Sequence, residues 1–318
     1  NLTSGNYVNV FDFSQDISTE NKNDMGELKA LILARGDYVA TYGDVEGLDK
    51  DTYNDTTGMS VMLTAEAQLD QMIHKMVTAI NDLLAPNVAA GDTIENLAGA
   101  GTTSITVTLA DGTTQEITSD TLILDADNCY VGSDKELPPR ELFSRIGTDR
   151  YTEATYTDAN GDEHKIYIYN EEDASDSSKQ YTLTSLEINE DLLNQETLLP
   201  FLSVTNYNVG YDLAASLADL WENSSVYLSP NDTKPCTFKE YYESMIGDLA
   251  TTGNVYNSIA TSLSATVLSV DNQRQEVIGV SSDEELTYMI KFQNAYNASS
   301  RFINVIDEMI EHLITQLG

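Results

Sequence analysis

The chain has 318 residues, of which 41% are hydrophobic, enough for two or three compact units and too many for a disordered protein. Acidic residues outnumber basic ones by 52 to 16, and the formal net charge is -36. Such a surface repels phosphate backbones and anionic lipids, so nucleic acid and membrane surfaces are disfavoured as partners. The sequence contains no apolar run near the ~20 residues that cross a bilayer.

The residues that usually carry chemistry form no recognisable site. The three histidines have no HExxH neighbourhood, and Cys129 and Cys236 lie outside any spacing typical of zinc sites. Whether these two cysteines form a disulfide stays open. Residues 125–128 begin like a calcium loop, but Cys129 and Tyr130 stand where a ligand and the glycine belong. Since no GxSxG or complete phosphate loop occurs either, we expect no enzyme, no cofactor and no metal site.

Two amphipathic helices are predicted near the start of the chain. The first covers residues 25–42, with Asp24 as its N-cap. The second covers residues 60–85 and ends at Pro86. Its predicted apolar face steps by three and four residues, through Met62, Ala65, Leu69, Ile73, Met76, Ile80 and Leu83.

From residue 87 the apolar period changes from helical to two, which predicts strands. Residues 105–109 and 114–117 flank an Asp111-Gly112 turn, and residues 151–156 and 166–169 flank a turn at Asn160-Gly161, so each pair predicts a hairpin. A further strand is expected at 183–188, and a short helix at 211–221. This pattern predicts a β-rich domain inserted between helical segments.

The strongest periodicity lies in the last 80 residues. Two seams of the kind seen in coiled coils are predicted, each sustained for about four heptads. The first runs through Phe238, Tyr242, Met245, Leu249, Thr252, Tyr256, Ile259, Leu263, Thr266 and Val270. After a break near Gly279, the second runs through Met289, Phe292, Tyr296, Ser299, Ile303, Ile306, Ile310, Leu313 and Leu317. A capping box of Ser282 and Glu285 is expected to start the second helix.

The lengths of the helices predict which of the two seams is covered by other helices of the same chain. The helices at 25–42 and 60–85 would be only about 27 and 39 Å long, at a rise of 1.5 Å per residue. We expect them to cover the seam of residues 238–270 but not the last helix along its whole length. Residues 303–317 are therefore predicted to need another chain.

The C-terminal segment resembles the bacterial flagellar hook-associated protein 1 family. The resemblance rests on Asn272, Gln273, Arg274, Gly279, Val280, Ser281, Asp283, Glu284 and Glu285, followed by a Phe-Gln-x-Ala-Tyr-x-Ala element that includes Phe292, Gln293 and Tyr296. Residues 26–35, and Leu186-Glu187-Ile188-Asn189 with the later Leu217-Ala218-Asp219-Leu220, are similar to further family segments. Residues 87–182 are unmatched.

The resemblance implies an extracellular structural protein, exported through the flagellar type III apparatus and assembled as a ring between hook and filament. It implies self-association, contacts with the hook protein and the second junction protein, and an export chaperone on the last helix. The residues expected in these contacts are Met289, Phe292, Gln293, Tyr296, Ile303, Ile306, Ile310, Leu313 and Leu317. Family members begin with a long helix that pairs with the last one, and we expect that helix to be missing before Asn1.

The sequence as a whole predicts an α+β protein. A discontinuous, elongated helical core is expected from residues 1–86 and 187–318, with a β-rich outer domain inserted at 87–186. The alternatives are another axial protein, such as a flagellin or the second junction protein, and a surface adhesin that binds through the outer β domain.

Overall fold

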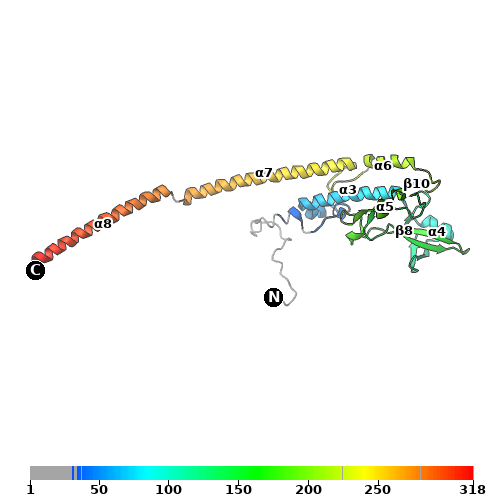
Figure 1. Ribbon diagram of the computed structural model, residues 1–318, viewed down its shortest axis with the longest axis horizontal. Coiled ribbons are helices and arrows are strands. Elements are labelled where there is room, and N and C mark those ends of the chain that lie inside the picture. Colours follow the sequence, from blue (N-terminus) through cyan, green and yellow to red (C-terminus); the bar gives the residue numbers. More distant parts are fainter. Residues whose placement is uncertain (1–30, 32–33, 37, 224, 280, 318) are drawn as a thin grey trace. The chain divides into compact units, whose positions relative to one another are not determined.

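A computed structural model describes residues 31, 34–36, 38–223, 225–279 and 281–317. The fold is α+β, as the sequence predicts, with a sheet region followed by two long C-terminal helices (Figure 1). The described residues up to Thr251 pack as one compact unit, and those from Thr252 onward form a second.

The helices and strands alternate irregularly along the chain. The α-helices are α2 (Lys50–Asp55), α3 (Val61–Leu84), α4 (Gly91–Ala98), α5 (Glu190–Asn194), α6 (Tyr211–Asn223), α7 (Phe238–Ile278) and α8 (Ser282–Leu317), and the 3-10 helices are η1 (Tyr42–Asp44), η2 (Thr57–Met59), η3 (Ser177–Lys179) and η4 (Glu196–Leu198). The strands are β1 (Asn87–Ala89), β2 (Ser104–Leu109), β3 (Thr114–Thr118), β4 (Leu122–Leu124), β5 (Tyr130–Val131), β6 (Phe143–Arg145), β7 (Tyr151–Thr157), β8 (Glu163–Tyr169), β9 (Leu186–Ile188) and β10 (Leu202–Ser203).

The helix predicted over residues 25–42 is wrong at its C-terminal end. Leu31, Ala34 and Arg35 are helical, but Gly36 has a φ of +82° and the chain from there to Thr41 is irregular. A left-handed glycine is a common helix terminator, because it has no Cβ to clash in that conformation. Asp24 and most of the family-like residues 26–35 lie outside the described residues.

Helix α3 begins and ends where the sequence predicts, but it buries a different face. The Ser60 hydroxyl accepts the Leu63 N–H as an N-cap, and the helix ends two residues before Pro86. The predicted face is only half-buried, and its Met62 is exposed. The fully buried residues lie one position further along, and several are polar: Leu63, Ala67, Gln68, Asp70, Gln71, His74, Val77, Asn81 and Leu84. Backbone groups bond Gln68, Asp70 and Asn81, and the Tyr241 and Glu172 side chains bond Gln71 and His74. An apolar count therefore misplaces the face.

Both predicted hairpins are present and join one six-stranded sheet in the order β1-β4-β8-β7-β2-β3. In the first hairpin Ile105 of β2 lies opposite Ile117 of β3, and in the second Tyr151 of β7 lies opposite Tyr169 of β8. The alternating residues of β2 place Ile105 and Val107 on one face, where they are buried.

Helix α4, which the sequence reading did not anticipate, covers that buried face (Figure 1). Its Ile94 is fully buried among the isoleucines and valines of the sheet, and Leu97 packs beside it. Eight residues with two glycines at the boundaries give little periodic signal. The packing of α4 nevertheless closes the core of the sheet.

Two further strand pairs connect segments far apart in the sequence. Strand β5 pairs with β10, and β6 pairs with β9, both antiparallel. The predicted return strand over 183–188 is thereby shortened to β9, while the predicted helix at 211–221 is confirmed as α6. The division into a helical core and an inserted domain at 87–186 stays a prediction.

Candidate assembly surface

The first turns of α7 are anchored in the core of the first unit. Phe238, Tyr241 and Met245 are buried in a cluster with Val226 and Leu228, and Leu69, Met72 and Met76 of α3 pack against it. The Tyr241 hydroxyl lies 2.9 Å from the Gln68 carbonyl oxygen and 2.8 Å from the Gln71 side-chain oxygen. This part of the first predicted seam is satisfied within the chain, as expected.

Within the first unit, the expectation that the rest of the first seam would be covered is wrong, because Tyr242 and Leu249 are exposed. In the second unit Tyr256, Ile259 and Leu263 are exposed too. The helix predicted at 25–42 ends at Arg35 rather than at Tyr42. An apolar stripe on α7 thus remains open to solvent.

The family-like residues surround the break between α7 and α8. Asn272, Gln273 and Arg274 lie in the last two turns of α7, where the Arg274 guanidinium pairs with Asp271 at 2.8 Å. Gly279 admits no side chain, because a Cβ there would lie 2.1 Å from the Gln275 carbonyl oxygen. Val280 lies outside the described residues.

Helix α8 starts one residue earlier than its predicted cap implies. The Glu284 N–H donates to the Ser281 hydroxyl at 3.4 Å, so Ser281, rather than Ser282, caps the helix. The acidic residues Asp283, Glu284 and Glu285 occupy the first turn, where carboxylates favour the positive end of the helix dipole. This sequence therefore specifies a firm new start after the break.

All the described side chains predicted to make assembly contacts lie on α8 and are exposed. Phe292 is 72% exposed, Tyr296 75% and Ile303 60%. The same holds for Met289, Gln293, Ile306, Ile310 and Leu313, while nothing is described of the Leu317 side chain. The structure thus brings these residues onto one face of one helix and covers none of those described.

The prediction from heptad spacing missed part of this face. Phe302, Val305, Met309 and Ile314 are exposed as well and lie beside the predicted seam. At about 100° per residue, the apolar arc of residues 302–314 spans roughly 180° of the helix circumference. A search at the 3.6-residue period of a straight helix would have found these four residues. The wider arc is more than a single facing helix covers.

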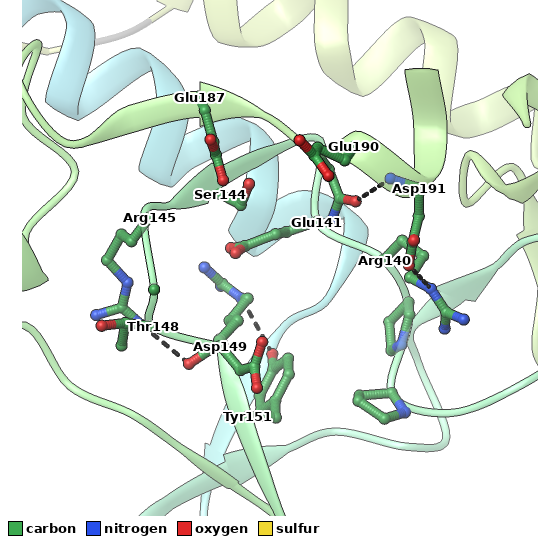
Figure 2. Close-up of a pocket in the computed structure, with 15 residues that line it drawn as sticks. Arg140, Glu141, Ser144, Arg145, Thr148, Asp149, Tyr151, Glu187, Glu190 and Asp191 are labelled. Atoms are coloured by element: carbon green, nitrogen blue, oxygen red, sulfur yellow. Dashed lines mark hydrogen bonds and ion pairs between the residues drawn. The ribbon is translucent and has the colours of Figure 1, made fainter. Parts of the chain in front are cut away.

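The first unit also contains a polar cavity of about 440 Å³, whose lining includes Arg140, Glu141, Ser144, Arg145 and Arg150 (Figure 2). The Arg145 guanidinium donates to the backbone oxygens of Lys179 and Asn170, both at 2.9 Å, and stacks on the Tyr181 ring. These bonds commit the buried arginine to holding loops together.

The neighbours of Arg145 are committed in the same way. Arg150 pairs with Asp82 at 2.5 Å, and the Tyr181 hydroxyl donates to Glu141 at 2.6 Å. Burial raises the pKa of Glu141 to about 7, against the lowering effects of the Tyr181 hydrogen bond and the nearby arginine charges. The groups around the cavity therefore join α3 to β6, β7 and the 170–185 loop, which is a structural role.

A second buried polar group fixes the same loop to α3. The His74 ring stacks on Tyr42 at a centroid distance of 3.6 Å, and its Nε2 lies 2.8 Å from Glu172. Burial alone would raise the pKa of Glu172, but the hydrogen bond and charge of His74 and the Tyr181 N–H hold it below its usual value. His74 is thus a packing residue.

The remaining motifs give no chemical site. Asp125 accepts the N–H groups of Asp127 and Asn128, which makes a local turn of the calcium-like segment. Both cysteines are free, with Cys129 buried. Within the described part of the chain, no group of three or more acidic, histidine or cysteine side chains could hold a metal ion. None of the helices described there is both long and apolar enough to span a bilayer.

Comparisons with known proteins match the end of the chain. Residues 272–317 match the family model described as the C-terminal part of the flagellar basal body rod FlgEFG proteins. A segment of 85 residues is 35% identical to the protein named flagellar hook-associated protein 1 of Bacillus subtilis (strain 168), covering 27% of this chain and 17% of that protein.

The resemblance read from the sequence is confirmed over this segment, and both matches are to structural components of the flagellum. The family model covers the end of α7 and all of α8, which carries the exposed apolar face. The C-terminal part of this chain is therefore similar to flagellar basal body rod proteins, and a segment of 85 residues is similar to a hook-associated protein 1.

Proposed function

We propose that this chain is a structural protein of the junction between hook and filament of a bacterial flagellum, built into it through α7 and α8. The observation that carries the proposal is that the segment matching flagellar proteins is also the segment with an uncovered apolar face. Contiguous exposed apolar surface of this extent is typical of an interface and is uncommon on soluble monomers.

The width of the apolar arc favours assembly into a bundle over a simple pair. A two-stranded coiled coil needs only a narrow seam, whereas residues 302–314 present about half of the helix circumference. Neighbouring copies in a ring, the hook protein below and the second junction protein above would supply several helices around α8. The same face would be held by an export chaperone before assembly.

The proposed setting is extracellular, after export through the flagellar type III apparatus. Individual hydrogen bonds hold polar loops on α3, and both thiols are free. These features are compatible with a chain that unfolds for export and refolds outside. The six-stranded sheet has no role in this proposal.

Deleting the full-length gene in the host tests the proposal. Intact hooks without filaments, together with flagellin shed into the medium, are the expected result, seen by electron microscopy and immunoblotting. Filaments that remain attached to hooks would overturn it. A strain that lacks hooks altogether would instead favour a rod or hook protein, the second candidate, which the description of the matching family model supports.

Complementation connects the phenotype to α8. A gene with Ile303→Asp, Ile306→Asp and Ile310→Asp should fail to restore filaments, because three charges would enter the apolar face. The matched control carries Asn297→Asp and Asn304→Asp, which add charge on the polar side of the same helix. This control should restore filaments to at least about half of the wild-type number, since exposed polar positions tolerate such changes.

A further inference from the structure

The last third of α8 combines its apolar face with an unbalanced negative charge. Between Phe302 and Leu317 the chain has three acidic residues, Asp307, Glu308 and Glu311, and no lysine or arginine. The last turn of α8 likewise contains no basic residue. His312 is the one other titratable side chain in this stretch.

The position of these carboxylates makes the charge unfavourable within the free helix. Asp307 and Glu311 are four residues apart on one edge of the apolar face, and like charges at that spacing repel. Among the described residues, none of the three forms an ion pair. A cationic neighbour would relieve this repulsion.

A second copy of the same helix does not supply that neighbour. Over its whole length α8 has six acidic residues but only two basic ones, Lys291 and Arg301. Parallel copies in register would bring the acidic edges together, and the chain as a whole carries a net charge of -36. Like charges across a helical interface disfavour the pairing and select other partners.

We propose that residues 302–317 of α8 bind an amphipathic helix of another protein whose apolar stripe is flanked by lysine and arginine. The apolar arc supplies the area that such a helix buries, and Asp307 and Glu311 pair with the cations along its edge. The proposal rests on the assignment of α8 as an assembly surface and names the chemistry of one partner there.

Two synthetic peptides test this directly on the full chain. Both have the same amphipathic helical sequence with a leucine stripe, and one has lysine and the other glutamate at the flanking positions. Binding is measured by fluorescence anisotropy at low and high salt. The lysine peptide should bind about tenfold tighter or more, and its advantage should shrink at high salt because the charges are exposed.

Matched variants locate the effect on the helix. The triple change Asp307→Asn, Glu308→Gln and Glu311→Gln should weaken binding of the lysine peptide about tenfold, since the carboxylates that pair with its lysines are lost. The triple change Asp283→Asn, Glu284→Gln and Glu285→Gln removes the same charge from the other end of α8 and should leave binding within about twofold. Circular dichroism confirms that both variants keep their helices.

Three outcomes would overturn the proposal: equal binding of the two peptides, binding of neither, or equal loss in both triple variants. Equal binding would leave α8 as an apolar assembly surface while removing the charge selectivity. Filaments that persist after gene deletion would remove the junction role without affecting the peptide result. The two proposals therefore fail separately.

Discussion

The sheet region and the C-terminal helices use the same apolar residue types with opposite results. Ile117 in β3 is fully buried beneath α4, whereas Ile303 in α8 is 60% exposed. The first unit closes its core within a single chain, by loops and short helices that come from distant parts of the sequence. The second unit leaves its apolar face open. Helix α7 thus joins a unit with a closed core to a unit with an exposed apolar face.

The same substitution in both regions should separate them most strongly. Ile117→Ala should lower the free energy of unfolding of the first unit by about 3 kcal/mol, since it opens a cavity in the sheet core. Ile303→Ala should change it by no more than about 0.5 kcal/mol in the free chain. Urea unfolding followed by the near-ultraviolet circular dichroism of the tyrosines measures both. Similar losses of free energy of unfolding in the two variants would mean that α8 packs against other parts of the same chain.

The pH dependence of the first unit should expose its buried carboxyl group. Because the pKa of Glu141 is raised to about 7 in the folded protein, its contribution is fully present below its unfolded pKa near 4.5 and is lost as pH rises through 7. This loss amounts to about 3 kcal/mol. Glu141→Gln should remove that part of the dependence, measured by urea unfolding between about pH 4 and 8. An unchanged pH profile would contradict the burial of this group.

The smallest expected effects come from the two helix caps. Ser60→Ala should destabilise the first unit by about 1 kcal/mol, because Ser60 caps α3 inside the packed region. Ser281→Ala should reduce the helicity of α8 in far-ultraviolet circular dichroism and leave the tyrosine transition unmoved. A coupled loss of tyrosine signal in the second variant would show that the two regions unfold together.

Local sequence patterns predicted the elements whose turns and ends are determined by neighbouring residues. The Asp111-Gly112 and Asn160-Gly161 turns fixed both hairpins, and Ser60 with Pro86 bounded α3, because turn chemistry and caps act over a few residues. The exposed face of α8 was also predicted, since an apolar face on the last helix exceeds what shorter helices can cover.

The features that the sequence did not predict depend on distant partners. Asp70 and Asn81 lie on the buried face of α3 because the backbone N–H groups of Leu183 and Leu142 donate to them, which no local pattern encodes. The pairs β5–β10 and β6–β9 involve two or three residues each, too few for a periodic signal. The early end of the first helix depends on the left-handed conformation of a single glycine, Gly36, which the apolar periodicity does not register.

Hydrogen exchange of α8 in two states tests most directly the central claim that its apolar face is an assembly surface. The amides of residues 302–314 should exchange rapidly in the free chain, where no tertiary packing protects their helix. In flagella isolated from the host they should exchange at least about a hundredfold more slowly, while amides of the sheet core change little. Equal exchange in the two states, or full protection already in the free chain, would contradict the account.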